Sequence, residues 1–289
     1  MKTMSTFPQS RLSKCLSIQP IHGYDRVEIW LDRPELPVTQ ARLESECTSL
    51  AVSIEQMEQN PRWKVKLAFH QPTDECLKRL LSALGHDVAM LVTYVEIACD
   101  WVGVNSQQTK RWRNALLASV HVAYRRNLFL RYLTSWYCGP RSRAGVRRGH
   151  TFAVYADKPS KLHNARPVET DPPCLHIEWR ASGSSAVASL SLISLEDLLG
   201  FDFDQFWENR LNAYALPKKT ELGRLLAKAS DVDIKVSDTA FYRRAQRWLE
   251  RHSDKNRFVL HNGLHEKKKL ARHLSTMSFW KWCESAIKH

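Results

Sequence analysis

The chain has 289 residues, of which 43% are hydrophobic and 25% charged, and its formal net charge is +13. This is the composition of a globular protein with a hydrophobic core, in one large domain or two small ones. We expect no membrane-spanning segment, because no apolar run approaches the roughly 18 to 20 residues that a span needs.

Alternating apolar residues predict strands, and an apolar period near 3.6 residues predicts helices. After an irregular segment over 1–20, strands are expected over 24–32, 63–70, 90–102, 133–138, 151–156 and 175–181. Helices are expected over 39–59, 76–84 and 107–126, and beyond residue 183 over 185–193, 195–200, 202–214, 219–229, 238–252 and 265–287. Thr73 or Asp74 is expected to cap the helix over 76–84.

This order of elements predicts an α+β fold with a mostly antiparallel sheet and packed helices, followed by a helical C-terminal region. Pro217 is the best candidate for a boundary between the two parts. The expected organisation is therefore an irregular N-terminus over 1–20, an α+β domain over 21–216 and a basic helical region over 217–289.

The positive charge is concentrated in two blocks of the chain. Residues 101–170 have a net charge of +11 and residues 210–289 of +10, whereas residues 1–100 and 171–209 are net negative. Two basic blocks around an acidic segment favour a surface that binds phosphates over an ordinary solvated basic face.

The seven cysteines are scattered and show no CxxC or CxxH spacing. That pattern argues against a structural zinc site and against a secreted disulfide framework, and it is typical of a reducing compartment. The first residues after Lys2 contain no apolar core, so they do not resemble a signal peptide. We therefore expect a cytoplasmic protein.

Two of the expected strands alternate acidic or histidine side chains with apolar ones. In VEIACDW, Glu96 and Asp100 share one face, and in CLHIEWR, His176, Glu178 and Arg180 share one face. If these strands are neighbours, the acids and the histidine can bind an ion together, and such a set suits Mg²⁺ or Mn²⁺ better than Zn²⁺. The alternative is an ordinary solvent face of an antiparallel sheet.

Two tyrosines lie in expected strands close to an arginine-rich loop. Tyr137 belongs to WYCGPR and Tyr155 to FAVYADK. A tyrosine hydroxyl can attack a phosphodiester and form a covalent phosphotyrosine, provided that its proton is removed or an ion stabilises the developing charge. The alternative is a core tyrosine with a satisfied hydroxyl. The residues of the loop that can steer and stabilise a phosphate are Arg141, Arg143, Arg147 and Arg148.

Taken together, these segments resemble the trans-acting replication initiation factor family, the rolling-circle initiators of plasmids, conjugative elements and filamentous phages. The resemblance covers about residues 24–182. The matching residues are Thr134, Tyr137, Gly139 and Ser142 in one motif, Tyr155, Asp157 and Lys158 in the next, and Glu178 in the last. The departures are the extra Ala156 after Tyr155, the two residues Ser135 and Trp136 between Thr134 and Tyr137, His176 in place of the arginine before the usual glutamate, and a longer loop after Ser142.

The resemblance implies a relaxase-like fold and nicking of one DNA strand at an origin by a tyrosine nucleophile with a divalent metal, Mg²⁺ or Mn²⁺. By position in the motif, Tyr155 is the expected nucleophile and Tyr137 the reserve. Asp100 and Glu178 are the first expected metal ligands, and Glu96 and His176 are the next. The expected DNA-binding residues are Arg141, Arg143, Arg147, Arg148, Lys158, Arg180, Arg243, Arg244 and Arg247.

The expected partner is origin DNA, single-stranded or in a hairpin, with a host helicase and a second copy of the chain as further candidates. A non-catalytic DNA-binding replication or regulatory protein of a mobile element, built on the same scaffold, stays open as the alternative function. An RNA-binding protein is a third alternative. The last basic helices, around Arg243 to Arg247, can supply phosphate contacts that position a strand without reading its sequence.

Overall fold

The computed structural model describes residues 19–36, 38–85, 88–122, 129–139, 149–214 and 276–287. Within these residues the main sheet has eight strands in the order β2-β3-β1-β4-β9-β8-β7-β6, and all neighbouring pairs are antiparallel. Its strands are β1 (Ile21–Leu31), β2 (Ser49–Ile54), β3 (Val65–His70), β4 (Met90–Val102), β6 (Phe129–Tyr132), β7 (Ser135–Cys138), β8 (Gly149–Tyr155) and β9 (Cys174–Ser182).

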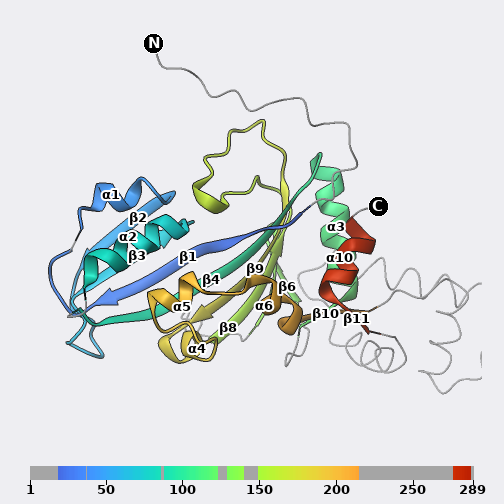
Figure 1. The fold of residues 1–289 in the computed structure, drawn as a ribbon. Coiled ribbons are helices and arrows are strands. Elements are labelled where there is room, and N and C mark those ends of the chain that lie inside the picture. The colour runs from blue at the N-terminus through green and yellow to red at the C-terminus, as the bar shows by residue number, and fades with distance from the viewer. Residues whose placement is uncertain are drawn as a thin grey trace, which may run out of the picture.

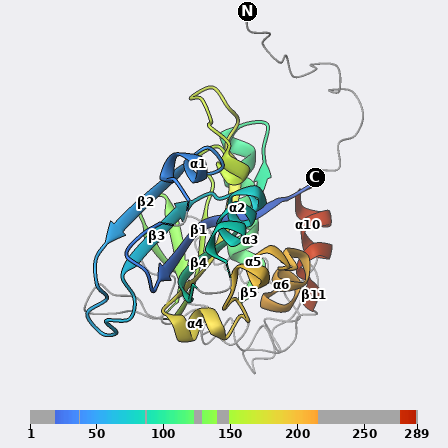
Figure 2. The same cartoon turned by 60° about the vertical axis from the view of Figure 1, so that its left-hand side comes forward.

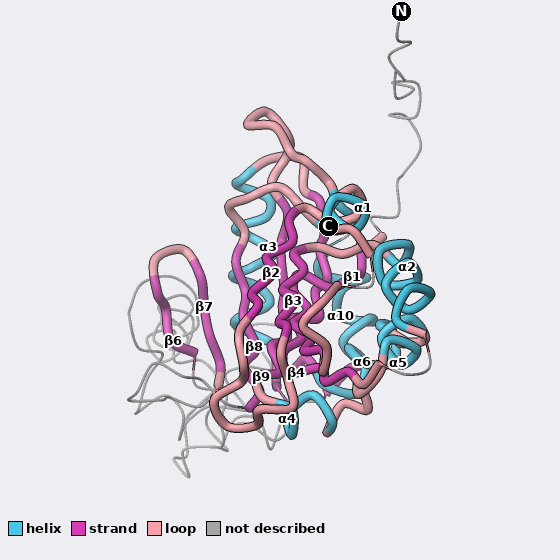
Figure 3. The backbone as a smooth tube through the Cα atoms, turned by 90° about the vertical axis from the view of Figure 1, so that its left-hand side faces the viewer, coloured by secondary structure: helices cyan, strands magenta, loops and turns pink. Residues whose placement is uncertain are grey.

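Helices pack against one face of this sheet (Figure 1). They are α1 (Gln40–Glu44), α2 (Asp74–Leu84), α3 (Ser106–Ser119), α4 (Ser184–Ala188), α5 (Leu195–Leu199), α6 (Phe203–Arg210) and α10 (Phe279–Ile287). A short 3-10 helix, η2 (Leu162–Asn164), follows β8 and precedes β9 in the sequence. Figures 2 and 3 show α2, α5 and α6 together on one side of the strands. The α+β fold with an antiparallel sheet and packed helices is therefore confirmed.

Alternation along the central strands decides which face meets the helices. Val95, Ile97 and Cys99 of β4 are fully buried in the same hydrophobic core as Ile177 and Trp179 of β9. Successive side chains point to opposite faces, so the residues between them line the other face of the sheet. That second face carries the polar side chains of both strands.

A small three-stranded sheet, β11-β10-β5, brings the end of the described chain back to the main body. Its strands are β5 (Val120–Val122), β10 (Leu211–Tyr214) and β11 (Thr276–Ser278). Helix α10 follows β11 and packs against α3 and α6 (Figure 1). A domain boundary at Pro217 stays a prediction, because residues 215–275 lie outside the described part of the chain, as do residues 1–18.

Several of the expected helices are wrong in part. In the one expected over 265–287, Thr276–Ser278 form the strand β11 ahead of α10, and the one expected over 185–193 ends at Ala188. The helix expected over 39–59 is the short helix α1 followed by the strand β2, which pairs with β3. Leu43, Cys47 and Leu50 are all buried, as a helical stripe requires, but Ile54 is 75% exposed. Pairing with the β3 backbone outweighs the local helical pattern here. The helix expected over 107–126 ends at Ser119 and continues as β5, and the one over 202–214 is α6 followed by β10.

The expected cap of α2 is confirmed at Thr73. Its side chain accepts a hydrogen bond from the Cys76 backbone N–H, at 3.1 Å, and Asp74 and Glu75 occupy the first turn. A hydroxyl at this position satisfies one of the free N–H groups that begin every helix, and acids there interact favourably with the helix dipole.

Gly103 lies where the chain leaves β4 and passes close to α3. A Cβ atom at this position would lie 2.4 Å from Cγ2 of Thr109 and 3.4 Å from the Trp112 ring. Thr109 is fully buried, and its hydroxyl donates to the carbonyl oxygen of Ala156 at 3.0 Å, so it cannot move aside freely. We expect Gly103→Ala to lower the free energy of unfolding by about 1–3 kcal/mol, measured by urea denaturation.

The control for this prediction is Val104→Ala at the next position, where the side chain is exposed. This substitution is expected to change the free energy of unfolding by less than about 0.5 kcal/mol. Equal urea midpoints for Gly103→Ala and Val104→Ala would show that the contact with Thr109 is not a constraint.

Candidate functional site

The polar face of the sheet brings together residues from β4, β8 and β9. Asp100 of β4 and Tyr155 of β8 are both direct cross-strand partners of His176 on β9. Glu178 lies two residues further along the same face of β9. Since β9 lies between β4 and β8, the acids and the tyrosine that are far apart in the sequence meet around one histidine ring.

The His176 ring has a different acid at each of its two nitrogens. Nδ1 contacts Oδ1 of Asp100, and Nε2 lies 3.4 Å from Oε2 of Glu178. One face of the ring stacks on the Tyr155 ring, with centroids 4.2 Å apart and an interplanar angle of 24°. Asp100 and Glu178 are fully buried, and His176 is 4% exposed. The imidazole is therefore held on two edges and one face.

A β-bulge in β1 adds a further acid to this face. Tyr24 pairs with Ile97 and Arg26 with Glu96, so Asp25 is an extra residue without a partner on β4. The bulge breaks the alternation, and the Asp25 carboxylate reaches His176 and Glu178, with one ligand atom of each of the three within 4.8 Å of the others. Bulges commonly re-aim a side chain in this way near functional sites.

Gln71 holds Asp25 in place. Its side-chain amide donates to the Asp25 carboxylate and, at 3.1 Å, to the Asp25 carbonyl oxygen. Gln71 is buried and has a φ of 45°, a left-handed conformation that non-glycine residues seldom adopt. Such strained residues cluster at functional sites, where the surrounding structure holds them.

Among the described residues, two groups of three side chains place ligand atoms close enough to hold a metal ion. One is Asp25, His176 and Glu178, and the other is Asp100, Cys174 and His176, with the atoms of each group within 4.8 Å of one another. Nε2 of His176 and Oε2 of Glu178 are buried, and apart from their long contact with each other, at 3.4 Å, they have no partner in the described part of the chain. Buried polar atoms normally have partners, so these two atoms fit a cation.

Glu96 lies on the same face but outside both groups. Its Oε1 lies 3.2 Å from Nε of Arg180 and also accepts a hydrogen bond from the Tyr94 hydroxyl. Arg180 contacts Glu178 as well, through the same Nε. The four expected ligands are therefore not all in one place. Glu178 and His176 belong to the same group, and Asp100 contacts the opposite edge of the His176 ring. Glu96 pairs with Arg180.

The electrostatics of the face follow from burial and from these pairs. Burial, and after it the charge of Glu178, raises the pKa of Glu96 to about 8. Burial also acts to raise the pKa of Glu178, but hydrogen bonding to His176 and the charge of Arg180 hold it well below its usual range. Of this pair, Glu178 therefore holds its negative charge more readily, and Glu96 is the one that takes up a proton more easily.

The pKa values of the stacked rings are shifted as well. Burial opposes the charged imidazole, but the interactions with Asp100, Tyr155 and Cys174 together outweigh it and raise the pKa of His176 well above its ordinary value. Burial raises the pKa of the Tyr155 hydroxyl well above its ordinary value. These surroundings therefore favour the charged form of His176 and the protonated form of the Tyr155 hydroxyl.

Tyr137, the reserve nucleophile, lies elsewhere on the face. It pairs with Ala153 across β7 and β8, and the Arg180 guanidinium lies 5.6 Å from the centre of its ring. Its ring therefore lies against Arg180, whereas the Tyr155 ring lies against His176. Tyr155 is the tyrosine that lies against the candidate metal ligands.

Of the expected DNA-binding residues, Lys158 and Arg180 lie in the described part of the chain. Lys158 is exposed, just after β8, and Arg180 is half-buried in its pairs with the two glutamates. The other expected residues, which lie outside the described residues, are Arg141, Arg143, Arg147, Arg148, Arg243, Arg244 and Arg247.

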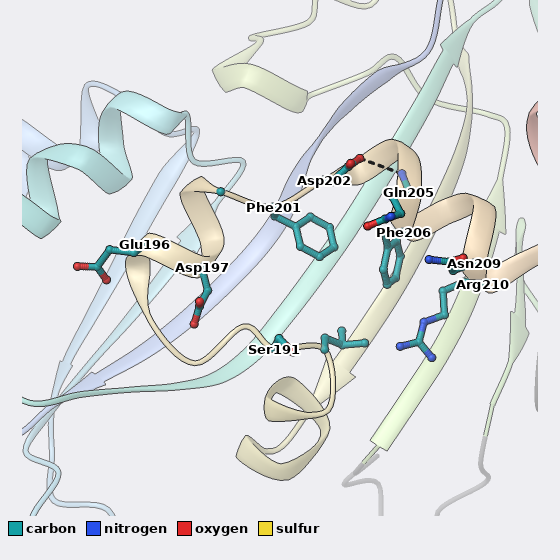
Figure 4. A pocket seen from close by; sticks show the side chains of 11 residues that line it. Ser191, Glu196, Asp197, Phe201, Asp202, Gln205, Phe206, Asn209 and Arg210 are labelled. Carbon is teal, nitrogen blue, oxygen red and sulfur yellow. Dashed lines mark hydrogen bonds between the residues drawn. The ribbon is translucent and has the colours of Figure 1, made fainter.

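A groove of about 750 Å³ lies on the helical side of the sheet and is lined by residues of α5, of α6 and of the turn that follows α4 (Figure 4). Phe206 lines it and packs edge-on against Trp179, a residue of the apolar face of β9. Asp202, at its rim, accepts a hydrogen bond from the Gln205 backbone N–H as the cap of α6. The groove is therefore on the face opposite the polar residues and is separate from them.

Sequence reasoning missed Asp25 and Cys174. Regular alternation assigns Asp25 to the apolar face with Val27 and Ile29, and no local signal marks the bulge. Cys174 was detectable, because it continues the alternation of His176 and Glu178 by one more step on β9.

No family model matches the chain, and no curated protein matches it. Among solved structures, a rolling circle replication initiator protein from Geobacillus stearothermophilus is similar to it, with a TM-score of 0.37 and 10% sequence identity over 69% of this chain and 88% of that chain. A likeness at this level transfers no residue role. Among the described residues, no helix is both long and apolar enough to span a bilayer.

Proposed function

We propose that this chain is a DNA replication initiation protein of the rolling-circle type, which nicks one DNA strand at an origin through a tyrosine nucleophile and a divalent metal. One observation carries the proposal. The Tyr155 ring stacks on His176, which lies beside Glu178 and Asp25 on the buried polar face of the sheet. The candidate nucleophile therefore lies next to the candidate metal ligands.

Asp25, Glu178 and Nε2 of His176 are the residues that would hold the metal. Two carboxylates and one imidazole suit Mg²⁺ or Mn²⁺. When bound, such an ion polarises a phosphate oxygen and neutralises the charge that develops during nucleophilic attack. Nε2 of His176 and Oε2 of Glu178 support this assignment, because these buried atoms have only a long contact with each other, at 3.4 Å, among the described residues.

Asp100 is proposed as a positioning residue instead of a ligand of this group. It contacts Nδ1 of His176, on the edge of the ring away from Glu178. A carboxylate that accepts a hydrogen bond from Nδ1 fixes the orientation of the ring and leaves the lone pair on Nε2, the arrangement found behind many histidine ligands of metals. Asp100 therefore influences metal binding indirectly, by orienting the His176 ring.

Tyr155 is the proposed nucleophile. Its oxygen attacks phosphorus, the new O–P bond forms, and the bond to the 3′ oxygen of the strand breaks. The phenolic proton passes to solvent, and the leaving 3′ oxygen takes up a proton, so the charge is conserved. Because the pKa of Tyr155 is raised by burial, the hydroxyl needs electrostatic help to lose that proton.

Basic residues at the edge of the face are proposed to bind the DNA backbone. Lys158 is exposed just after Tyr155 in the chain and can contact a phosphate next to the reacting one. The arginines of residues 141–148 and 243–247 remain predicted contacts. Such contacts position a strand without reading its bases.

A non-catalytic DNA-binding protein on the same scaffold is the second candidate function. The ion pairs within the polar face favour it, because the Glu178 carboxylate contacts the side chains of both His176 and Arg180. This candidate predicts DNA binding that weakens with salt and leaves the strand intact.

The test is to incubate the full chain with supercoiled plasmid that carries the DNA flanking its own gene. We expect Mn²⁺ to convert the plasmid to open circle, with protein attached to the nicked strand after SDS treatment, and EDTA to prevent both. Salt-sensitive binding without nicking at any Mn²⁺ concentration would replace the first candidate by the second.

A further inference from the structure

The Nδ1 side of His176 carries a second group of candidate ligands, and this group contains a thiol. Asp100, Cys174 and His176 offer ligand atoms within 4.8 Å of one another, and all three side chains are buried. The group on the Nε2 side has two carboxylates instead. The two sides of one ring therefore differ in the kind of metal that they suit.

The strand register explains why Cys174 faces this group. Cys174 pairs with Val102 and His176 with Asp100, so the thiol lies one alternation step from the imidazole on the same face of β9. The Cys174 thiol donates to the carbonyl oxygen of Lys158 at 3.3 Å, and its backbone N–H donates to the same oxygen at 2.9 Å. The sulfur is therefore held beside the ring by β9 and by the residues that follow β8.

The Asp100 carboxylate gives independent support for a cation at this group. Oδ1 contacts the imidazole, but Oδ2 is buried and has no hydrogen-bond partner among the described residues. A carboxylate oxygen without a donor is unfavourable in a buried position. A positive ion between Asp100, Cys174 and His176 would satisfy it.

We propose that Asp100, Cys174 and His176 form a binding site for a borderline-soft divalent metal ion, Zn²⁺ in a cell, and that this site inhibits the DNA-nicking site. Thiolate, imidazole and carboxylate are the three ligand types that zinc takes in proteins, and three protein ligands leave a fourth position for water. Binding displaces the thiol proton to solvent, and the proton on Nδ1 of His176 leaves that nitrogen as well. The inhibitory part rests on the proposed function, whereas the binding part does not.

Inhibition follows from the chemistry of one ring. A neutral imidazole has a lone pair on one nitrogen and a proton on the other. An ion bound at Nδ1 leaves the proton on Nε2, which then points towards Glu178 and cannot bind a second cation there. Zinc beside Cys174 and Mn²⁺ beside Glu178 therefore exclude each other.

Binding is tested with Co²⁺ as a spectroscopic probe for the zinc site in the full chain. We expect a near-ultraviolet absorption band from thiolate-to-cobalt charge transfer, which added Zn²⁺ removes. Cys174→Ser is expected to lose the band. Cys99→Ala, at a buried cysteine on the apolar face of β4, is the matched control and is expected to keep it. No band in the wild type, or an unchanged band in Cys174→Ser, overturns the site.

Inhibition is tested by adding Zn²⁺ to the Mn²⁺-dependent nicking reaction, with each protein compared with its own zinc-free rate. The zinc concentration that halves the rate is expected to rise by about tenfold or more in Cys174→Ser. A cobalt band without zinc inhibition overturns the inhibitory role. A cobalt band in a protein that nicks no DNA overturns the proposed function and leaves the metal site standing.

Discussion

Replacing Tyr155 by phenylalanine is expected to abolish the covalent adduct between protein and DNA while DNA binding persists. The substitution removes the hydroxyl and keeps the ring that stacks on His176 at 4.2 Å, so the site keeps its packing. Removing the nucleophile of an enzyme lowers its rate by roughly 10³-fold or more. The measurement is an SDS gel of end-labelled single-stranded DNA after reaction in Mn²⁺, with binding followed by fluorescence anisotropy.

Tyr137→Phe is the matched control for this prediction. It removes the same group from a tyrosine on the next strand, beside Arg180 instead of His176. The adduct is expected to form at a rate close to that of the wild type. The opposite result, loss of the adduct in Tyr137→Phe and retention in Tyr155→Phe, would move the nucleophile to β7 and detach it from the candidate metal group.

The second large effect is expected on metal affinity. Asp25→Asn and Glu178→Gln each remove one charged oxygen from the group that includes Nε2 of His176. Substituting a residue that only supports a metal ligand changes metal affinity by about 10- to 100-fold. Loss of a ligand itself is therefore expected to lower Mn²⁺ affinity by at least that factor. The measurement is a titration in which free Mn²⁺ is followed by its electron paramagnetic resonance signal.

Glu28→Gln is the matched control for the metal prediction. Glu28 also lies on β1 and is mostly buried, but it pairs with Arg26 and, at 2.8 Å, with Lys66, and it belongs to neither candidate group. Its removal is expected to leave Mn²⁺ affinity nearly unchanged. If Asp25→Asn behaves like Glu28→Gln, the bulge does not serve a metal and Asp25 has another role.

The face assignments of single strands could be predicted from the sequence. Alternation correctly placed Asp100 with Glu96 and His176 with Glu178, because the pleat of a strand is a local property with a period of two residues. The same local reasoning placed Tyr155 on a strand. None of these assignments needs knowledge of which strands are neighbours.

Local reasoning failed where another part of the chain decides the conformation. The helix expected over 39–59 gives way to β2, because the backbone of β3 offers a partner that the segment itself does not reveal. Asp25 leaves the face that alternation assigns to it, because the register between β1 and β4 contains one extra residue. A bulge depends on both strands of a pair, and the sequence of one strand does not specify it.

The sequence by itself determined that this chain is an α+β protein and that acids, a histidine and tyrosines line single faces of its strands. Only the tertiary structure decided that β9 lies between β4 and β8, and that β1 delivers Asp25 beside them. The physical reason is the range of the interactions. Side-chain alternation follows from each residue and its immediate neighbours, whereas strand order and bulges follow from packing one face of the whole sheet against its helices.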